Sequence, residues 1–438
     1  MNIILLSGGS GQRLWPLSND VRSKQFIKIF KDENGTYESM VQRVYKQIRE
    51  VDADSNVTIA TSKTQVSAIN NQLGPDVGIS IEPCRRDTFP AIALASAYLH
   101  DKQGVAMDEP VVVCPVDPYV DRAYFEALKK LSDLAASGSA NLTLMGINPT
   151  YPSEKYGYII PEDKNEVSMV TAFKEKPDVE TAKDYIEKGA LWNGGIFAYK
   201  LSYLLNKAHE LIDFTDYDDL FAKYETLDKI SFDYAVVEKE SSINVIRFGG
   251  MWKDLGTWNT LTEAMQENVI GDALLNENCE NVHVINDMNV PVIVMGIKNA
   301  VIASSPEGIL VSDKEQSSYI KPFVEQIEQP IMFAEKSWGS YQVIDVEKDS
   351  MTIKVTLNPG HSMNYHSHDR RDEVWNIVRG SGKTIVDGIE RNVSAGDVVA
   401  MAAGSKHTVI NNGDEVLQII EVQLGSEISV EDKHKFEL

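Results

Sequence analysis

The sequence predicts three successive structural units: an α/β domain on a mainly parallel, doubly wound sheet, a small module of stacked short strands, and an all-β barrel or double-sheet roll. The chain has 438 residues, and a domain typically takes roughly 150. Its first half alternates short apolar runs with longer amphipathic segments, the pattern of α/β domains. The remainder consists of short β-type runs divided by Asn, Asp, Gly and Pro, with little helical periodicity.

Composition and charge narrow the class of protein. Hydrophobic residues make up 43% of the chain and charged residues 24%, so neither wholesale disorder nor a fibrous repeat fits. The net charge of −23 repels nucleic-acid backbones and anionic membrane surfaces. Three widely separated cysteines indicate buried thiols in a reducing compartment. No signal peptide or run of about 20 apolar residues is evident. We therefore expect a soluble, cytoplasmic protein with neither nucleic-acid nor membrane partners.

The elements of the α/β domain follow from hydrophobic periodicity. Continuous apolar runs predict strands that are covered on both faces, and apolar residues at helical spacing predict the helices between them. The expected strands are residues 2–7, 57–61, 78–82, 111–115 and 142–147, and the expected helices are residues 37–50, 63–73, 90–103 and 123–137. Ligands of such sheets bind beyond the carboxyl ends of the strands, so the turns after residues 7 and 114 are the first candidates for a site.

The pattern changes near residue 265 and again near residue 330. We expect the α/β domain at 1–265, the β module at 266–325, a linker at 326–330 and the all-β domain at 331–438. The module's expected strands are residues 282–285, 292–295, 300–303 and 308–311. Tight Gly and Asp turns in the last domain separate evenly spaced short strands, which is typical of a barrel or a double-sheet roll.

A glycine-rich turn at residues 8–13 directly follows the first expected strand. Glycines there let backbone N–H groups close on phosphate oxygens. The turn is not a dinucleotide fingerprint, because Leu14 stands where the third glycine belongs, and no P-loop sequence follows. A tight structural connection is the alternative interpretation. Two cations close by in an acidic chain, Arg13 and Lys24, favour a polyanionic ligand.

Two aspartates are candidates for a Mg²⁺ site. Asp117 follows the strand at 111–115, and Asp254 lies in the sequence WKDLG. Carboxylate oxygens are the ligands that Mg²⁺ prefers. Either residue alone is more often a cap or turn residue. Together with the phosphate-binding turn, the pair predicts phosphoryl or nucleotidyl transfer, in which positioning and charge neutralisation supply most of the catalysis.

Eight blocks in order resemble the mannose-1-phosphate guanylyltransferase family, in its long form fused to a mannose-6-phosphate isomerase type II-like cupin. The blocks are GGSGQRLWPLS (8–18), KQF (24–26), EPCRRDTFPAI (82–92), YGYI (156–159), FKEKP (173–177), WNGGIF (192–197), DYAVVEK (233–239) and WKDLGTW (252–258). The resemblance covers nearly the whole chain. It implies a Rossmann-like, GT-A-like nucleotidyltransferase domain, a short left-handed β-helix-like module and a cupin barrel.

The same resemblance implies a reaction and its residues. A sugar-1-phosphate oxygen attacks the α-phosphorus of a nucleoside triphosphate and releases pyrophosphate, in a pathway of polysaccharide biosynthesis. The catalytic residues would be Arg13, Lys24, Asp117 and Asp254, of which the two aspartates bind Mg²⁺. The nucleotide would be bound by Gly8, Gly9, Gly11, Arg13, Lys24, Arg86 and Thr88, and the sugar phosphate by Gly157, Glu175, Lys176, Asn193 and Asp233.

Two departures from the family leave the substrates open. The family's Ser-Asp-His becomes Val116-Asp117-Pro118, with Tyr119 after it, and its Pro-Lys-Gln becomes Ser23-Lys24-Gln25. GDP-mannose synthesis from GTP and mannose-1-phosphate is the first interpretation. A cytidylyl- or other nucleotidyltransferase acting on a different phosphorylated acceptor is the second, and a non-catalytic nucleotide or sugar sensor is the third.

The last domain carries a candidate site for a transition metal. The spacing G-x5-H-x-H-x4-E-x6-G from residue 360, and the later segment 396–411, resemble the two cupin motifs, with Ala402 where proline is usual. His366 and His368 would face the same way on a strand, and turns would add Glu373 and His407. Zn, Fe and Mn all suit this ligand set. Surface histidines are the alternative interpretation.

The sequence supports two interpretations of the cupin, an isomerase and a domain without isomerase activity. Arg371 and Glu373 fit the isomerases' Arg-x-Glu pattern, but the family's Tyr-Gly-Arg tail is absent, because the chain ends in VEDKHKFEL. A cupin kept for assembly, regulation or another small substrate competes with the isomerase interpretation. The β module offers an edge for a homodimer.

Overall fold

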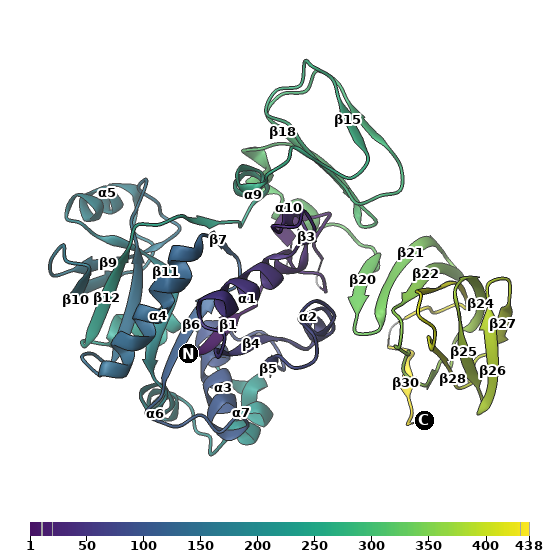
Figure 1. Ribbon diagram of the computed structural model, residues 1–438, viewed down its shortest axis with the longest axis horizontal. Coiled ribbons are helices and arrows are strands. Elements are labelled where there is room, and N and C mark those ends of the chain that lie inside the picture. Colours follow the sequence, from purple (N-terminus) through teal and green to yellow (C-terminus); the bar gives the residue numbers. More distant parts are fainter. Residues whose placement is uncertain (10–11, 20, 430, 438) are drawn as a thin grey trace. The chain divides into compact units, whose positions relative to one another are not determined.

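The structure is a computed structural model that describes residues 1–9, 12–19, 21–429 and 431–437 (Figure 1). The chain forms two compact units. The first contains residues 1–9, 24–66 and 75–266, and the second contains residues 10–23, 67–74 and 267–438. The β module and the C-terminal barrel thus count as one unit, and the division of the chain into three domains stays a prediction.

A nine-stranded sheet forms the centre of the first unit, in the order β5-β4-β1-β6-β11-β8-β12-β10-β9. Its strands are β1 (Asn2–Leu6), β4 (Asn56–Ser62), β5 (Gly78–Glu82), β6 (Pro110–Pro115), β8 (Leu142–Ile147), β9 (Gly157–Pro161), β10 (Val167–Lys174), β11 (Leu191–Lys200) and β12 (Ile243–Phe248). Consecutive residues of β1 are fully buried, so both faces of the sheet are covered. The predicted α/β class is confirmed.

The sheet is fully parallel only in its first half. Strands β5, β4, β1 and β6 run parallel, whereas β11 pairs antiparallel with β6, β8 and β9. Because β9 and β10 are joined by a short turn, they can pair only antiparallel. The expectation of a mainly parallel sheet therefore holds up to β6. Beyond β6 the pairings are antiparallel, except that β12 pairs in parallel with β8.

Helices follow the first strands as expected, with small shifts at their ends. The helices of this unit are α1 (Met40–Val51), α3 (Thr88–Asp101), α4 (Arg122–Ser137), α5 (Val179–Glu187), α6 (Leu201–Leu211), α7 (Tyr217–Lys223), α8 (Phe232–Ala235) and α9 (Trp258–Ala264). The first helix starts later than predicted, because β3 (Tyr37–Glu38) pairs with β2 (Phe30–Lys31) and Ser39 caps the helix. The segment expected at 63–73 divides into a 3₁₀ turn, Lys63–Gln65, and α2 (Val66–Leu73).

The β module winds as stacked coils. Its elements are β14 (Val269–Ile270), β15 (Ala273–Leu275), β16 (His283–Asn286), β17 (Val292–Val294), β18 (Ala300–Ser305), β19 (Gly308–Asp313), a 3₁₀ turn at Gln316–Tyr319 and α10 (Lys321–Val324). Strands β14, β16 and β18 pair in parallel, as do β15 and β17, so successive coils lie on one another. This stacking confirms a β-helix-like module.

The C-terminal domain consists of two antiparallel sheets, in the orders β20-β21-β22-β29-β24-β27 and β26-β25-β28-β23-β30 (Figure 1). Its strands are β20 (Phe333–Lys336), β21 (Gly339–Glu347), β22 (Ser350–Leu357), β23 (His366–Ser367), β24 (Asp372–Arg379), β25 (Ser381–Val386), β26 (Ile389–Ser394), β27 (Val398–Met401), β28 (His407–Ile410), β29 (Leu417–Leu424) and β30 (His434–Lys435). The expected all-β barrel is confirmed. In the described part of the chain, every helix is too short or too polar to span a bilayer.

Candidate functional site

The two candidate Mg²⁺ ligands are held next to each other by a short two-stranded sheet. Asp117 lies in the turn between β6 and β7 (Pro118–Val120), and Asp254 is the last residue of β13 (Trp252–Asp254). Strands β7 and β13 pair antiparallel, and the Cα of Asp254 lies opposite that of Pro118, the neighbour of Asp117. Residues far apart in the sequence thus present two carboxylates at one point.

Lys24 joins these two carboxylates. Its Nζ lies 2.6 Å from Oδ2 of Asp117 and 3.9 Å from Oδ1 of Asp254. The side chains of the aspartates are 34% and 42% exposed, which leaves room for the water ligands that Mg²⁺ retains. Two part-exposed carboxylates that already attract one cation are a donor set that fits Mg²⁺.

Lys24 is positioned by its neighbour. It begins a 3₁₀ turn, Lys24–Phe26, and the buried amide of Gln25 donates hydrogen bonds to the hydroxyl of Ser7 at 3.0 Å and to its carbonyl at 3.3 Å. These bonds fix the turn to the carboxyl end of β1. The sequence did not assign this role to Gln25, although its place in the KQF block was a signal.

The glycine turn opens directly from β1. Gly8 and Gly9 are exposed, and a Cβ added at either would meet no atom within 4 Å. Gly9 has φ +136°, a conformation that favours glycine, and its carbonyl accepts a hydrogen bond from Arg85 at 3.0 Å. Gly11 lies outside the described residues. Arg13 is exposed on a 3₁₀ turn, Gln12–Leu14, which belongs to the second unit.

Arg86 and Thr88, which are also predicted to bind the nucleotide, form hydrogen bonds within the protein. Arg86 donates a hydrogen bond to the carbonyl of Glu225, and the Thr88 hydroxyl accepts one from the Phe232 N–H at 2.8 Å. Both bonds tie the start of α3 to the 225–232 segment. The structure does not bring Arg86 and Thr88 to the aspartates by any contact among the described residues.

The five predicted sugar-phosphate residues lie on strands β9 and β11, in the turn after β10, and on helix α8. Gly157 lies opposite Asn193 in the β9–β11 pair. Asn193 donates a hydrogen bond to Asp233 at 2.6 Å, and Lys176 forms an ion pair with Glu175 at 2.7 Å. Gly157 is required by close approach, because a Cβ there would lie 2.5 Å from Oε2 of Glu175.

This group of residues contains one carboxylate with an unsatisfied oxygen and one with a perturbed pKa. Oε2 of Glu175 is buried and accepts no hydrogen bond within the described residues. Burial and repulsion by Glu175 raise the pKa of Asp233 to about 6. Hydrogen-bond acceptors that lack donors suit the hydroxyl groups of a sugar.

Aromatic side chains missed by the sequence reasoning lie between the two groups of residues. The ring of Tyr156 packs against Trp192 at 4.8 Å and against Trp252 at 5.7 Å. Burial and the charge of Asp254 raise the pKa of Tyr156 well above its usual range. The blocks that contain these rings were the available signal.

Tyr119, one of the residues that depart from the family pattern, packs against Phe30 and Arg43. Its ring packs on Phe30 at a centroid distance of 5.0 Å, and the guanidinium of Arg43 lies 4.8 Å from the ring centroid. Successive residues of a strand face opposite ways, so Tyr119 occupies the face of β7 opposite to Pro118. Pro118 lies opposite Asp254 in the β7–β13 pair, so of Pro118 and Tyr119 it is Pro118 that adjoins the site.

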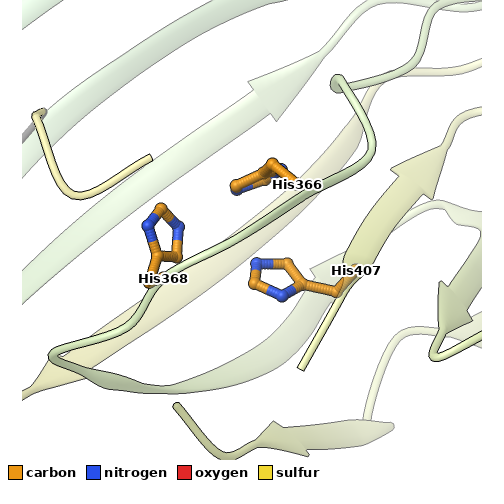
Figure 2. A group of neighbouring side chains, drawn as sticks. All are labelled: His366, His368 and His407. Atoms are coloured by element: carbon orange, nitrogen blue, oxygen red, sulfur yellow. The ribbon is translucent and has the colours of Figure 1, made fainter. Parts of the chain in front are cut away.

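In the barrel, His366, His368 and His407 converge (Figure 2). Each offers one ligand atom, and these atoms lie within 4.8 Å of one another. His366 and His407 are directly opposite in the β23–β28 pair. Glu373 joins them from β24: its Oε1 lies 3.1 Å from Nε2 of His368, and its Oε2 lies 3.2 Å from Nε2 of His407. The predicted cupin set is thus brought together.

The backbone orients all three imidazoles. Nδ1 of His366 lies 2.6 Å from the Asn364 carbonyl, that of His407 lies 2.9 Å from the Ser405 carbonyl, and that of His368 is hydrogen-bonded to the Asp432 carbonyl. A carbonyl only accepts, so each Nδ1 carries the proton and each Nε2 is left with a lone pair. This is the arrangement of metal-ligating histidines.

Electrostatics favour the metal-binding forms of these groups. Burial, with the charge of Lys433, lowers the pKa of His366 to about 3, so this imidazole is neutral at pH 7. Burial alone would raise the pKa of Glu373, but the neighbouring imidazoles of His368 and His407 hold it well below its usual range. Nε2 of His407 has no hydrogen-bond partner in the described part of the chain. Three imidazole nitrogens and one carboxylate fit Zn, Fe or Mn.

Two families match the chain. Residues 2–269 match the family described as nucleotidyl transferase, and residues 325–438 match the family described as mannose-6-phosphate isomerase C-terminal. The first match covers more than half of the chain, and the two follow each other in the order that the sequence blocks indicate.

Individual relatives agree over the full length. Xanthan biosynthesis protein XanB of Xanthomonas campestris is 29% identical, over 99% of this chain and 97% of the relative. Mannose-1-phosphate guanylyltransferase of Escherichia coli is 28% identical, over 99% and 97%. The crystal structure of a mannose-1-phosphate geranyltransferase from Thermus thermophilus has a TM-score of 0.61 and 26% identity, and covers 74% of this chain and 98% of its own.

Proposed function

Because the chain belongs to the nucleotidyl transferase family, we propose that it makes GDP-mannose from GTP and mannose-1-phosphate, with Mg²⁺, for polysaccharide biosynthesis. The single observation that carries the chemistry is the meeting of Lys24 with Asp117 and Asp254 at the carboxyl edge of the sheet. Full-length similarity to a mannose-1-phosphate guanylyltransferase supports the choice of base and sugar.

The residues have separate tasks in this reaction. Backbone N–H groups at Gly8 and Gly9 would bind the triphosphate, and the resemblance implies the same task for Gly11 and Arg13. Asp117 and Asp254 would hold Mg²⁺, which when bound neutralises charge on the α-phosphate and the attacking phosphate. Lys24 supplies a positive charge to the same phosphates and leaves the carboxylates when the cation binds.

The sugar phosphate binds beside them. Glu175, with its unsatisfied Oε2, accepts hydrogen bonds from sugar hydroxyls, and Asn193 with Asp233 holds the far edge of the sugar. Lys176 leaves its ion pair with Glu175 to bind the phosphate. The enzyme would act in the cytoplasm, where its nucleotide substrate is made, and the β module would join two copies.

An activity matrix tests this proposal. The purified chain is incubated with each of GTP, ATP, CTP and UTP, with mannose-1-phosphate, glucose-1-phosphate or another phosphorylated acceptor, and pyrophosphate is measured. We expect release with GTP and mannose-1-phosphate in the presence of Mg²⁺. Release only with CTP or another acceptor would establish the alternative transferase, and no release from any pair would leave the sensor interpretation.

A second function is supported by the barrel. Three imidazoles and Glu373 gather in a domain that matches the isomerase family, so we propose that the cupin is a metal-dependent isomerase of a sugar 6-phosphate. The test is the interconversion of mannose-6-phosphate and the corresponding ketose phosphate, with metal content measured in parallel. A metal-loaded protein that interconverts no sugar phosphate would contradict this proposal.

A further inference from the structure

The inner wall of the barrel continues beyond the histidines as a second polar surface. Alternate residues of β29 point inward, and the last two of them are polar: Glu421 is 7% exposed and Gln423 is 5% exposed. Two earlier inward positions of the same strand, Leu417 and Ile419, are buried and apolar. The strand thus changes from hydrophobic core to buried polar wall along its length.

This wall adjoins the metal-binding cluster. In the β24–β29 pair, Gln423 lies opposite Glu373, and Glu421 lies opposite Trp375. Directly opposite residues of antiparallel strands have neighbouring side chains. The Trp375 ring packs edge-on against His407 at a centroid distance of 5.3 Å. Glu421, Gln423 and Trp375 therefore form a patch, which we call the β29 wall, beside the three imidazoles.

The β29 wall has hydrogen-bonding capacity that the described residues leave unused. The Trp375 side chain is fully buried, and its Nε1–H has no acceptor in the described chain. Glu421 accepts one hydrogen bond, from the amide of Gln423 at 2.5 Å. Arg371, the buried cation nearby, forms its ion pair with Glu373 at 3.0 Å instead.

Burying such a carboxylate is costly. A carboxylate removed from water without a paired cation loses several kcal/mol or takes up a proton. A fold that needed only a filled core would place an apolar side chain here, as it does at Ile419. Costly buried polar groups beside a cluster of metal-binding side chains mark functional sites.

The C-terminal tail brings a cation to the same region. The carboxylate of Asp432 accepts the backbone N–H groups of Asp369 and Arg370 at 3.0 and 3.1 Å, and β30 pairs with β23. This fixes Lys433, whose charge interacts with Glu421 and Glu373. The tail therefore supplies a positive group that could bind the phosphate of a substrate.

We propose that Glu421 is the proton-transferring base of the cupin. Gln423 and Trp375 Nε1–H would bind the hydroxyls of an aldose or ketose phosphate, and Lys433 its phosphate. This inference rests on the proposed isomerase function. Neither the cupin motifs nor the metal ligands include Glu421.

Isomerisation through Glu421 only moves hydrogens within the substrate, so it needs no further reactant. Its carboxylate removes the proton from C2 of the aldose, and the electrons of that C–H bond form the C1–C2 double bond while O1 takes a proton. The carboxylic acid then returns its proton to C1, and O2 loses its hydroxyl proton to become the ketone. One hydrogen moves from C2 to C1 and one from O2 to O1, with no external oxidant or reductant.

The test compares the full chain, Glu421→Gln and the control Glu347→Gln, which changes an exposed glutamate of β21. Metal content is measured by mass spectrometry, mannose-6-phosphate binding by calorimetry, and exchange of the C2 hydrogen with deuterated water by NMR. We expect Glu421→Gln to keep its metal and to bind the sugar phosphate within a few-fold, but to lose exchange by about 10²–10⁴-fold.

The outcomes distinguish the isomerase function of the cupin from the role of Glu421 as its base. If wild-type protein exchanges the hydrogen and Glu421→Gln exchanges it equally fast, the role of Glu421 is wrong and the isomerase function stands. If metal-loaded wild-type protein neither binds nor exchanges any sugar phosphate, the isomerase function is wrong and the role of Glu421 with it. Loss of metal from Glu421→Gln would assign the residue to the metal site and overturn its role as base. In Trp375→Phe, we expect weaker sugar binding with exchange retained at saturation.

Discussion

The ammonium nitrogen of Lys24 lies 2.6 Å from a carboxylate oxygen of Asp117. The two residues come from different turns, one after β1 and one after β6, and β1 pairs in parallel with β6. Parallel strands bring their carboxyl ends to one edge of the sheet. Lys24 and Asp117, which we propose act on the phosphates, therefore meet because β1 and β6 are neighbours in the sheet.

Loss of either aspartate should abolish nucleotidyl transfer without unfolding the protein. In Asp254→Asn, one charged oxygen ligand is removed while the size of the side chain is kept, so we expect kcat to fall by about 10³-fold. The side chain is 42% exposed, so its replacement leaves the core intact. Pyrophosphate release and the thermal midpoint measure the two effects.

Asp272→Asn is the matched control, because Asp272 is exposed on the β module. Full activity of the control with loss in Asp254→Asn would assign the effect to the site. An Asp254→Asn enzyme that keeps wild-type kcat with Mg²⁺ would contradict the assignment.

Gly157→Ala should weaken sugar-phosphate binding selectively. The new Cβ would lie 2.5 Å from Oε2 of Glu175, so the carboxylate must shift away from the sugar hydroxyls. We expect KM for the sugar phosphate to rise by about 10-fold or more, equivalent to the loss of one hydrogen bond. KM for the nucleotide should be unchanged. The control is Gly413→Ala, where the nearest atom to the new Cβ is 3.5 Å away. A parallel rise in both KM values would argue against a separate sugar pocket.

Asp233→Asn should stabilise the protein at neutral pH. Burial and Glu175 raise the pKa of Asp233 from 3.8 to about 6, so the folded state binds the proton more tightly than the unfolded chain. Stability from this group is complete below pH 4 and is lost as pH rises from 4 to 6. The variant should be more stable at pH 7.5 by on the order of 3 kcal/mol, with the difference vanishing below pH 4. Urea unfolding at several pH values measures this, and a less stable variant at pH 7.5 would refute it.

His407→Ala should remove metal from the barrel. The substitution deletes one of three converging ligands. Mutation of a residue that only hydrogen-bonds to a metal ligand already lowers metal affinity by about 10-fold or more, so we expect loss of a ligand to lower it by at least as much. His361→Ala is the control, since His361 is exposed and its Nδ1 contacts the Pro359 carbonyl. Equal metal content in both variants would show that the histidines are structural.

Glu307→Ala should destabilise the second unit. Oε1 of Glu307 accepts hydrogen bonds from the side chain of Asn19 at 2.7 Å and from the backbone of Met332 and Phe333 at 3.0 and 3.1 Å. Three donors would lose their acceptor in a buried place, at a cost of about 3 kcal/mol in the free energy of unfolding. Glu315→Ala, at an exposed position of the same module, should change it by less than about 0.5 kcal/mol. Equal effects in the urea midpoint would contradict the role of Glu307.

Local patterns predicted the elements well because hydrophobic periodicity is local. The strands expected at 78–82 and 142–147 have those bounds in the structure. The order of the second half of the sheet was not predictable, because the pairings of β11 with β6, β8 and β9 depend on contacts between distant segments. A strand's sequence does not specify its neighbour or direction.

The site divides in the same way. The spacing within one motif located His366, His368 and Glu373. The family resemblance identified the residues that we propose bind the sugar. Nothing in the sequence marked Glu421 or Trp375, because a single inward-facing residue on a strand resembles any other until the barrel closes. Strand β30 pairs with β23, and the Asp432 carbonyl accepts a hydrogen bond from His368.

The central claim is that this chain joins GMP from GTP to mannose-1-phosphate at Asp117 and Asp254. The direct measurement is mass spectrometry of the products formed by the full chain with GTP, mannose-1-phosphate and Mg²⁺, beside Asp254→Asn. We predict GDP-mannose and pyrophosphate in equal amounts from the wild type and neither from the variant. A folded wild-type protein that forms no nucleotide sugar from this pair would contradict the claim.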